Sequence, residues 1–171
     1  VDLVSNYADI SSFLKDQPYN SSGGKHYGIP HGWGANYLMY NSKVVTTAPD
    51  SWGAVFDTNS PYKGKITAYD APISIADAAL YLKSAKPDLG IKDPYSLTQA
   101  QFDASVALLK DQHGVIGEYW NDYTKAQSAF EQGTTVIALS APVSGFTHFA
   151  RCGVNPSANQ HSVAKTVLIR M

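Results

Sequence analysis

Apolar and polar positions follow two different periods along the first 140 residues. Short apolar or alternating runs between turn residues predict strands, whereas longer segments with apolar residues at i, i+3, i+4 and i+7 predict helices. The predicted strands are 26–29, 36–40, 65–69 and 134–139, and the predicted helices are 51–56, 73–83, a segment from Thr98 onward and 122–131. Residues 115–120 fit a strand or a loop. The alternation predicts an α/β fold of three layers with a small central sheet.

Proline residues define the ends of the helix predicted over 73–83. Pro72 fits its first position because proline has no N–H to lose, and this makes Ala71 the cap. Pro87 stops the helix. The apolar residues expected on one side are Ile73, Ala76, Ala79 and Leu80.

Capping residues locate the other helices. Ser51 is a candidate N-cap, Thr98 and Gln101 have the spacing of a capping box, and Gly133 ends the helix over 122–131. The apolar stripes expected are Phe102, Val106 and Leu109 on the helix after Thr98, and Tyr123, Ala126 and Phe130 on the last helix. Each stripe predicts an amphipathic helix packed on the sheet.

Composition fits a globular domain. The chain has 171 residues, of which 44% are hydrophobic and 16% are charged, enough for one sizeable core. No apolar run approaches the ~20 residues that cross a bilayer, and residues 1–5 lack the character of a signal, although a signal could have been removed earlier. A net charge of −1 gives no general reason to bind nucleic acid or an anionic membrane. Cys152 is the single cysteine, which rules out an internal disulfide.

Charge is distributed unevenly along the chain. All fourteen acids lie between Asp2 and Glu131, whereas residues 141–171 carry Arg151, Lys165 and Arg170 without an acid. We therefore divide the chain into a domain at 1–140 and an atypical tail at 141–171. A basic arm, a short β element and sequence foreign to the domain remain open as descriptions of the tail.

The main candidate for a functional residue is Asp70. It ends the strand over 65–69, directly before Ala71-Pro72. Carboxyl ends of parallel strands line the crevice where α/β proteins bind ligands. An acid there either interacts with the helix N-terminus or faces a bound cation, and the residues alone leave both readings open.

Aromatic residues cluster near the predicted loops. Together with one carboxylate, aromatic rings form a site for an ammonium group, because the ring quadrupole attracts the cation and the acid neutralises it. The alternative is that the rings belong to the core or its rim. The rings concerned are Trp33, Tyr37, Tyr69, Tyr119 and Trp120.

Enzyme signatures are weak. The sequence has no G-x-S-x-G elbow, Walker loop or G-x-G-x-x-G fingerprint, and its five histidines lack metal-ligand spacing. Glu118, Asp122 and Glu131 supply carboxylate pairs, as any acidic chain does. We therefore expect no catalytic residue, metal or cofactor. A small α/β hydrolase or transferase using the same crevice is the alternative.

Four ordered blocks of sequence resemble the spermidine/putrescine-binding proteins, extracytoplasmic solute receptors of ABC importers. The blocks are 25–34 (KHYGIPHGWG), 38–41 (LMYN), 51–57 (SWGAVFD) and 62–70 (YKGKITAYD), and residues 130–133 (FEQG) before a hydrophobic strand add to them. The resemblance runs from about residue 7 to about residue 140 and rests on the order of the blocks.

The resemblance implies a type II periplasmic binding fold, of which this chain holds mainly the second lobe, a three-layer αβα unit with a small mixed sheet. Residues 28–34 resemble the strand that enters this lobe, and Asp70 matches an acid that holds a polyamine amino group. Ile73 stands where polyamine receptors can carry a second acid, so the resemblance leaves a polyamine, a smaller amine and an amino-acid-like solute open as the ligand. The ligand residues predicted are Asp70, Trp33, Tyr69 and Tyr37.

The resemblance also implies a function without chemistry. The chain is expected to be a substrate-binding component, or a fragment of one, whose partners are a small cationic solute and a membrane permease. Its location would be periplasmic or extracellular, and membrane-associated in some hosts. Residues 141–171 lack the family's aromatic ligand residue and its Trp- and Asp-bearing strand, which suggests truncated or non-family sequence. A half-receptor that folds but binds nothing appreciable is a further alternative.

Overall fold

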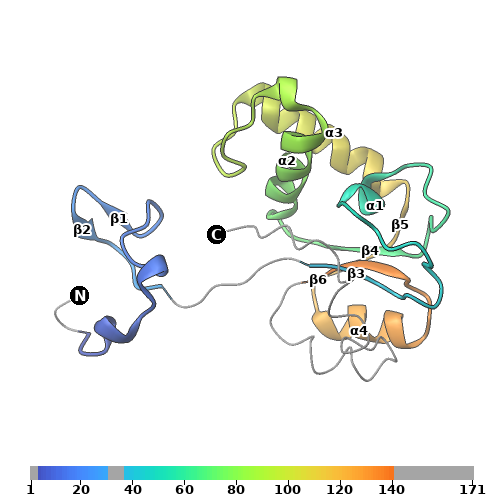
Figure 1. Ribbon diagram of the computed structural model, residues 1–171, viewed down its shortest axis with the longest axis horizontal. Helices are drawn as coiled ribbons and strands as arrows, with labels where there is room; N and C mark the ends of the chain where they lie inside the picture. Colours follow the sequence, from blue (N-terminus) through green and yellow to red (C-terminus); the bar gives the residue numbers. More distant parts are fainter. Residues whose placement is uncertain (1–3, 31–36, 141–171) are drawn as a thin grey trace. The chain divides into compact units, whose positions relative to one another are not determined.

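The computed structural model describes residues 4–30 and 37–140. Its contacts divide the chain into two compact units, one built on residues 1–34 and the other on residues 35–169 (Figure 1). The division near residue 34 falls inside the domain predicted over 1–140. The tail predicted at 141–171 lies outside the described residues and stays a prediction.

The larger unit contains a four-stranded mixed sheet with the order β3-β6-β4-β5. Strands β6, β4 and β5 run parallel to one another, and β3 pairs antiparallel with β6 at the edge. The strands are β3 (Tyr37–Tyr40), β4 (Ile66–Tyr69), β5 (Ile116–Trp120) and β6 (Ile137–Ser140). The small mixed sheet is therefore confirmed, and residues 116–120 form a strand.

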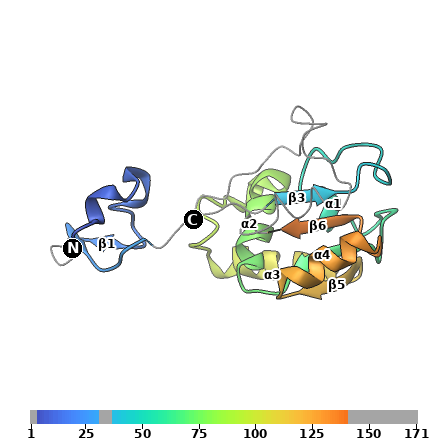
Figure 2. The ribbon, with the colours of Figure 1, turned by 90° about the horizontal axis from the view of Figure 1, so that it is seen from below.

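Helices cover both faces of this sheet. Figures 1 and 2 show α1, α2 and α3 on one face and α4 on the other. The helices are α1 (Gly53–Phe56), α2 (Ser74–Ala85), α3 (Gln99–His113) and α4 (Tyr123–Glu131), with a 3-10 turn, η3, at Pro87–Leu89. This arrangement is the predicted three-layer αβα lobe.

The main core lies between the sheet and the first helical layer. Ile66 of β4 and Val55 of α1 are completely buried, and Ile137 of β6 is 1% exposed. Because successive residues of a strand point to opposite faces, Ile66 and Ala68 face this core while Thr67 faces the α4 layer. Burial of both faces agrees with the three successive buried residues at the start of β4, Ile66 to Ala68.

Local signals located two helices correctly. Thr98 and Gln101 form the predicted capping box, in which the Thr98 side chain accepts from the Gln101 N–H and the Gln101 side chain accepts from the Thr98 N–H. Helix α4 starts after Asp122, and Gly133 follows its C-cap with φ of +72°. Ala126 and Phe130 are buried as expected.

The predicted start of α2 was wrong. The helix begins at Ser74, because Pro72 and Ile73 form a preceding turn in which the Ser74 N–H bonds to the Ala71 carbonyl. The Ser74 hydroxyl also donates to the Tyr69 carbonyl at 2.9 Å, which ties the helix start to the end of β4. The buried apolar residues of α2 are Ala76, Ala78, Ala79 and Leu82, whereas Ile73 and Leu80 are half-buried.

The predicted stripe of α3 was correct for Leu109, which packs against the core, but wrong for Phe102. Phe102 is 39% exposed, whereas Ser105 and Gln112 are buried. Helix α3 packs on α1 and α2, so its inward face is set by these helices rather than by its most apolar residues. Hydrogen bonds satisfy the polar inward positions. The Ser105 hydroxyl donates to the Gln101 carbonyl within α3, and Gln112 Nε2 donates to the Val55 carbonyl of α1 at 3.1 Å.

Three smaller corrections concern element ends. Strand β2 covers Lys25–His26 rather than 26–29. Helix α1 has Trp52 at its N-cap, although the Ser51 hydroxyl still accepts from the Gly53 N–H. Strand β6 begins at Ile137, because Thr134 and Thr135 bond to the Ala129 carbonyl at the end of α4.

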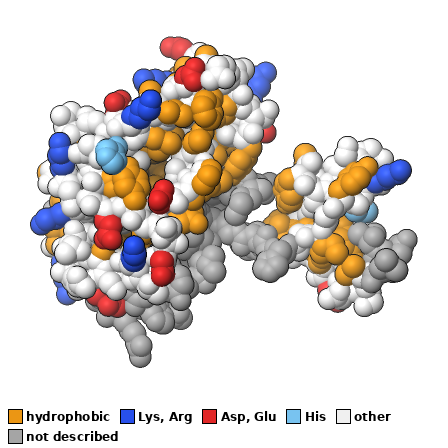
Figure 3. Space-filling model, turned by 180° about the vertical axis from the view of Figure 1, so that it is seen from behind, with side chains coloured by type: hydrophobic (Ala, Val, Ile, Leu, Met, Phe, Trp, Pro, Cys, Tyr) orange, Lys and Arg blue, Asp and Glu red, His pale blue; other side chains and the backbone are white. Residues whose placement is uncertain are grey.

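The smaller unit contains short elements only. These are the 3-10 turns η1 (Tyr7–Asp9) and η2 (Ser12–Leu14) and the antiparallel strands β1 (Ser21–Ser22) and β2. Within residues 4–30, Leu14 is the buried apolar side chain. Asn20 Nδ2 donates a hydrogen bond to the backbone carbonyl of Leu14 at 2.7 Å. Figure 3 shows hydrophobic side chains over the surface of this unit. The larger apolar residues exposed here are Phe13, Tyr19, Tyr27 and Ile29.

Candidate functional site

The parallel strands β4 and β5 end side by side at one edge of the sheet. Tyr69 lies opposite Trp120 in the register, and the Asp70 N–H donates to the Trp120 carbonyl at 2.8 Å. Helix α2 follows β4, and helix α4 follows β5. Asp70 therefore occupies the carboxyl edge of the sheet, the position expected from the sequence.

Asp70 is exposed and lies near the phenol of Tyr119. Burial raises the pKa of Tyr119 above its ordinary value of 10, and the negative charge of Asp70 raises it further. The Tyr119 ring stacks on His113 of α3, with centroids 5.6 Å apart, and its hydroxyl lies 3.4 Å from His113 Nδ1. Burial and the charge of Asp70 thus both favour the neutral form of the Tyr119 phenol.

Tyr69 points to the other face of the sheet. Its half-buried ring lies against the Trp120 ring, with centroids 4.7 Å apart and planes inclined by 34°. Alternation along the strands places Tyr69 and Trp120 towards α4, whereas Tyr119 faces α3. Asp70 and Tyr69 are consecutive residues, so their side chains point to opposite faces of the sheet. Only the end of β4 brings the two close together.

Tyr37 belongs to the same edge of the sheet. It is the first residue of β3 and pairs with Ser140, the last residue of β6. Because β3 runs antiparallel to β6, the start of β3 lies level with the carboxyl ends of the parallel strands. Trp33 lies outside the described residues, so its predicted role stays a prediction.

Trp120 is the residue whose importance the sequence did not reveal. In the sequence, Trp120 is one of several aromatic residues near a predicted loop. In the fold it contacts both Tyr69, through its ring, and Asp70, through its carbonyl. Only the parallel pairing of β4 with β5 brings these residues together.

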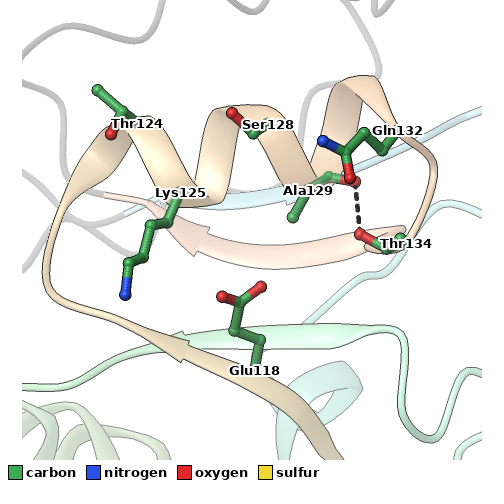
Figure 4. Close-up of a pocket in the computed structure, with 7 residues that line it drawn as sticks. All are labelled: Glu118, Thr124, Lys125, Ser128, Ala129, Gln132 and Thr134. Atoms are coloured by element: carbon green, nitrogen blue, oxygen red, sulfur yellow. Dashed lines mark hydrogen bonds between the residues drawn. The ribbon is translucent and has the colours of Figure 1, made fainter.

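A polar hollow of about 270 Å³ lies between β5 and α4 (Figure 4). Glu118 and Lys125 extend into it from β5 and α4, and its polar side chains are exposed to solvent. Its lining residues are Glu118, Thr124, Lys125, Ser128, Ala129, Gln132 and Thr134. None of the predicted ligand residues lines this hollow, so it is separate from the strand-end site.

Asp122, one of the carboxylates considered for catalysis, acts as a helix cap. It accepts hydrogen bonds from the backbone N–H and the hydroxyl of Thr124 at 2.9 and 2.8 Å. These bonds hold the pKa of Asp122 below its ordinary value of 3.8. A carboxyl group that remains ionised in this way is poorly suited to act as a general acid.

Within 4–30 and 37–140, no group of three His, Cys, Asp or Glu side chains could hold a metal ion. No helix in these ranges is long and apolar enough to span a bilayer.

Comparison with known proteins gives one family and several related folds. Residues 1–151 match the family described as bacterial extracellular solute-binding protein. The structure is similar to a spermidine/putrescine ABC transporter substrate-binding protein, PotD, from Streptococcus pneumoniae, with 20% identity and a TM-score of 0.60 over 88% of this chain. This chain covers 42% of that protein, so it spans less than half of its length.

Two more solved structures share the fold. The TpPotD lipoprotein of Treponema pallidum is 17% identical, with a TM-score of 0.53 over 67% of this chain and 33% of that one. MotA from A. tumefaciens B6, solved in complex with glucopine, is 17% identical, with a TM-score of 0.55 over 79% of this chain and 42% of that one. At these identities the similarity establishes the fold alone.

Proposed function

This chain belongs to the bacterial extracellular solute-binding protein family, and we propose that it binds a small amine-bearing solute as part of an ABC importer's receptor. The solute lies at the carboxyl edge of the sheet, beside Asp70, and undergoes no chemistry there. The receptor works outside the cytoplasm, in the periplasm or at the cell surface. Its partner in the membrane is the importer's permease.

The observation that carries this proposal is the position of Asp70. Its carboxylate is exposed, and its backbone N–H is fixed to the Trp120 carbonyl at the end of β5. Its negative charge acts on the Tyr119 phenol and raises the pKa of that group. A carboxylate beside an aromatic ring attracts an ammonium group through its charge and through the ring quadrupole.

Neighbouring residues favour a solute that presents one ammonium group to this lobe. The residue three positions after Asp70 is the half-buried Ile73 rather than an acid. On the next strand end, the Asp122 carboxylate is engaged by Thr124 at the start of α4. A monoamine or an amino-acid-like solute fits this arrangement better than a long polyamine does.

The remaining predicted contacts complete the proposed site. Tyr69 forms a wall on the α4 side of the strand end, and the start of β3 brings Tyr37 to the same edge. Trp33 lies outside the described residues and stays a predicted ligand residue. An amine as the solute is supported by the S. pneumoniae relative, which is a spermidine/putrescine ABC transporter substrate-binding protein.

Calorimetry with this chain tests the proposal. We expect weak binding of putrescine and of 4-aminobutanoate, with 4-aminobutanoate binding at least as tightly as putrescine. Asp70→Asn should weaken both by about tenfold, or about 1.4 kcal/mol, because an exposed carboxylate loses less than a buried charge partner would.

Asp88→Asn provides the matched control. Asp88 is an exposed acid in η3, at the end of α2 opposite to its start beside Asp70, and its substitution makes the same change in net charge. It should leave both affinities unchanged within twofold. Binding that Asp70→Asn does not weaken, an equal loss in Asp88→Asn, or no binding of any amine would refute the proposal.

A further inference from the structure

Trp120 contacts two of the residues proposed to bind the solute, Tyr69 through its ring and Asp70 through its backbone. It is the last residue of β5 and is 4% exposed, so it is out of reach of a solute in the crevice. Its ring packs against the Tyr69 ring at 4.7 Å. Its carbonyl accepts the Asp70 N–H at 2.8 Å.

The end of β5 is also held from the α4 side. Two residues after Trp120, the Asp122 carboxylate bonds to the Thr124 N–H in the first turn of α4. Strand pairing with β4 and this cap therefore restrain the chain on both sides of Trp120. Because Trp120 is held in place, it also restrains the positions of the two residues that it contacts, Asp70 and Tyr69.

Packing, rather than hydrogen bonding, keeps the indole ring in place. Trp120 Nε1 is buried and has no hydrogen-bond partner in the part of the chain that the structure describes. An unpaired buried donor does not stabilise the fold, so the contribution of the ring comes from its area and shape. A phenyl ring should preserve most of that contribution, whereas an aliphatic side chain should not.

We propose that Trp120 is a positioning residue of the amine site. It holds the Tyr69 ring from the α4 side and the Asp70 backbone from the β5 side, without touching the solute. This inference rests on the proposed function. It adds that the geometry of the site is determined by a buried residue on the strand neighbouring the one that carries Asp70.

Three variants test this role. Trp120→Leu removes the aromatic ring, Trp120→Phe retains one, and Trp52→Leu makes the same replacement at another buried tryptophan, in the core on the opposite side of the sheet. Two quantities are measured at a temperature where every variant is folded: the affinity for 4-aminobutanoate, and the hydrogen-exchange rate of the Asp70 amide by NMR. The exchange rate requires no ligand.

Trp120→Leu should weaken binding at least tenfold and accelerate exchange of the Asp70 amide at least tenfold relative to Trp52→Leu. Trp120→Phe should stay within threefold of the wild type in both measurements. Equal effects of Trp120→Leu and Trp52→Leu would overturn the proposal, because the role of Trp120 would then be general stability. A loss in Trp120→Phe as large as that in Trp120→Leu would also overturn it. If the wild type binds no amine, the proposed function fails, and the exchange rates alone decide whether Trp120 positions Asp70.

Discussion

The two units of this chain differ in how their elements are stabilised. In the larger unit, residues from four strands and three helices share a core around Ile66 and Ile137. In the smaller unit, Leu14 is the buried apolar side chain within residues 4–30, and Tyr27 is 75% exposed. Local bonds such as those of Asn20 hold the smaller unit's turns together.

This difference indicates where the stability of the protein resides. Burial of apolar surface is the dominant favourable contribution to folding, and a unit with one buried apolar residue among residues 4–30 gains little from it there. The larger unit should therefore unfold cooperatively, while the smaller unit should contribute almost nothing to that transition.

The largest effect should come from truncating the shared core. Ile66→Ala should lower the unfolding free energy of the larger unit by about 2–5 kcal/mol, because Ile66 is completely buried in the middle of the sheet. Leu14→Ala makes a similar truncation in the smaller unit and should change the main transition by less than about 0.5 kcal/mol. Denaturant titration followed by circular dichroism measures both. Equal losses would show that the two units share one core.

A slightly smaller effect is expected from Gly117→Ala. Gly117 is the extra residue where the β4–β5 register shifts, and a Cβ there would collide with the Gly64 carbonyl. The strand must move, which should cost about 1–3 kcal/mol. Gly114→Ala is the control, since its Cβ would lie 3.4 Å from the Asp111 oxygen at a helical φ of −67°. Thermal melts should show a clear loss for Gly117→Ala only.

Gln112→Leu tests a polar bond inside the core. Gln112 is 2% exposed, and its Nε2 donates to the Val55 carbonyl, which links α3 to α1. Leucine fills a similar volume but leaves that carbonyl without this donor, so the expected loss is about 1–3 kcal/mol of unfolding free energy. A variant as stable as the wild type would show that the carbonyl finds another partner.

Thr67→Val also removes a buried polar group, but unlike Gln112→Leu it should not lower the stability. Thr67 is 1% exposed, and within the described part of the chain its hydroxyl has no hydrogen-bond partner. Valine has nearly the same shape and no polar atom to bury. Chemical denaturation should show an unchanged or slightly raised stability, by up to about 1 kcal/mol. A clear loss would reveal a bonded hydroxyl in solution.

The smallest effect concerns the pH dependence of α4. Bonds to Thr124 hold the pKa of Asp122 below 3.8, so the ionised cap stabilises the folded state above that pH. This contribution should disappear as the pH falls through the lowered pKa. Asp122→Ala should remove that part of the acid sensitivity in melts between pH 2 and pH 6. Thr98→Ala on α3 is the control, because a hydroxyl cap does not titrate in this range and its loss should be independent of pH.

Short-range signals predicted much of the fold. The capping box at Thr98 and the glycine after α4 fix helix ends through contacts within a few residues, and both were correct. Phe102 shows the limit of such reasoning. Its apolar character suggested a buried stripe, but the packing of α3 on two other helices buried Gln112 instead. No local pattern specifies which face a neighbouring helix will cover.

The sequence by itself determined the order of the elements and placed Asp70 at the end of a strand, because strand periodicity and turn residues act locally. Only the tertiary structure decided that Trp120, fifty residues further along, bonds to Asp70 and packs on Tyr69. It also decided that Tyr69 points towards α4, on the face opposite to Tyr119. The physical reason is the parallel register of β4 and β5, which depends on contacts between distant segments and on the burial of both faces of the sheet.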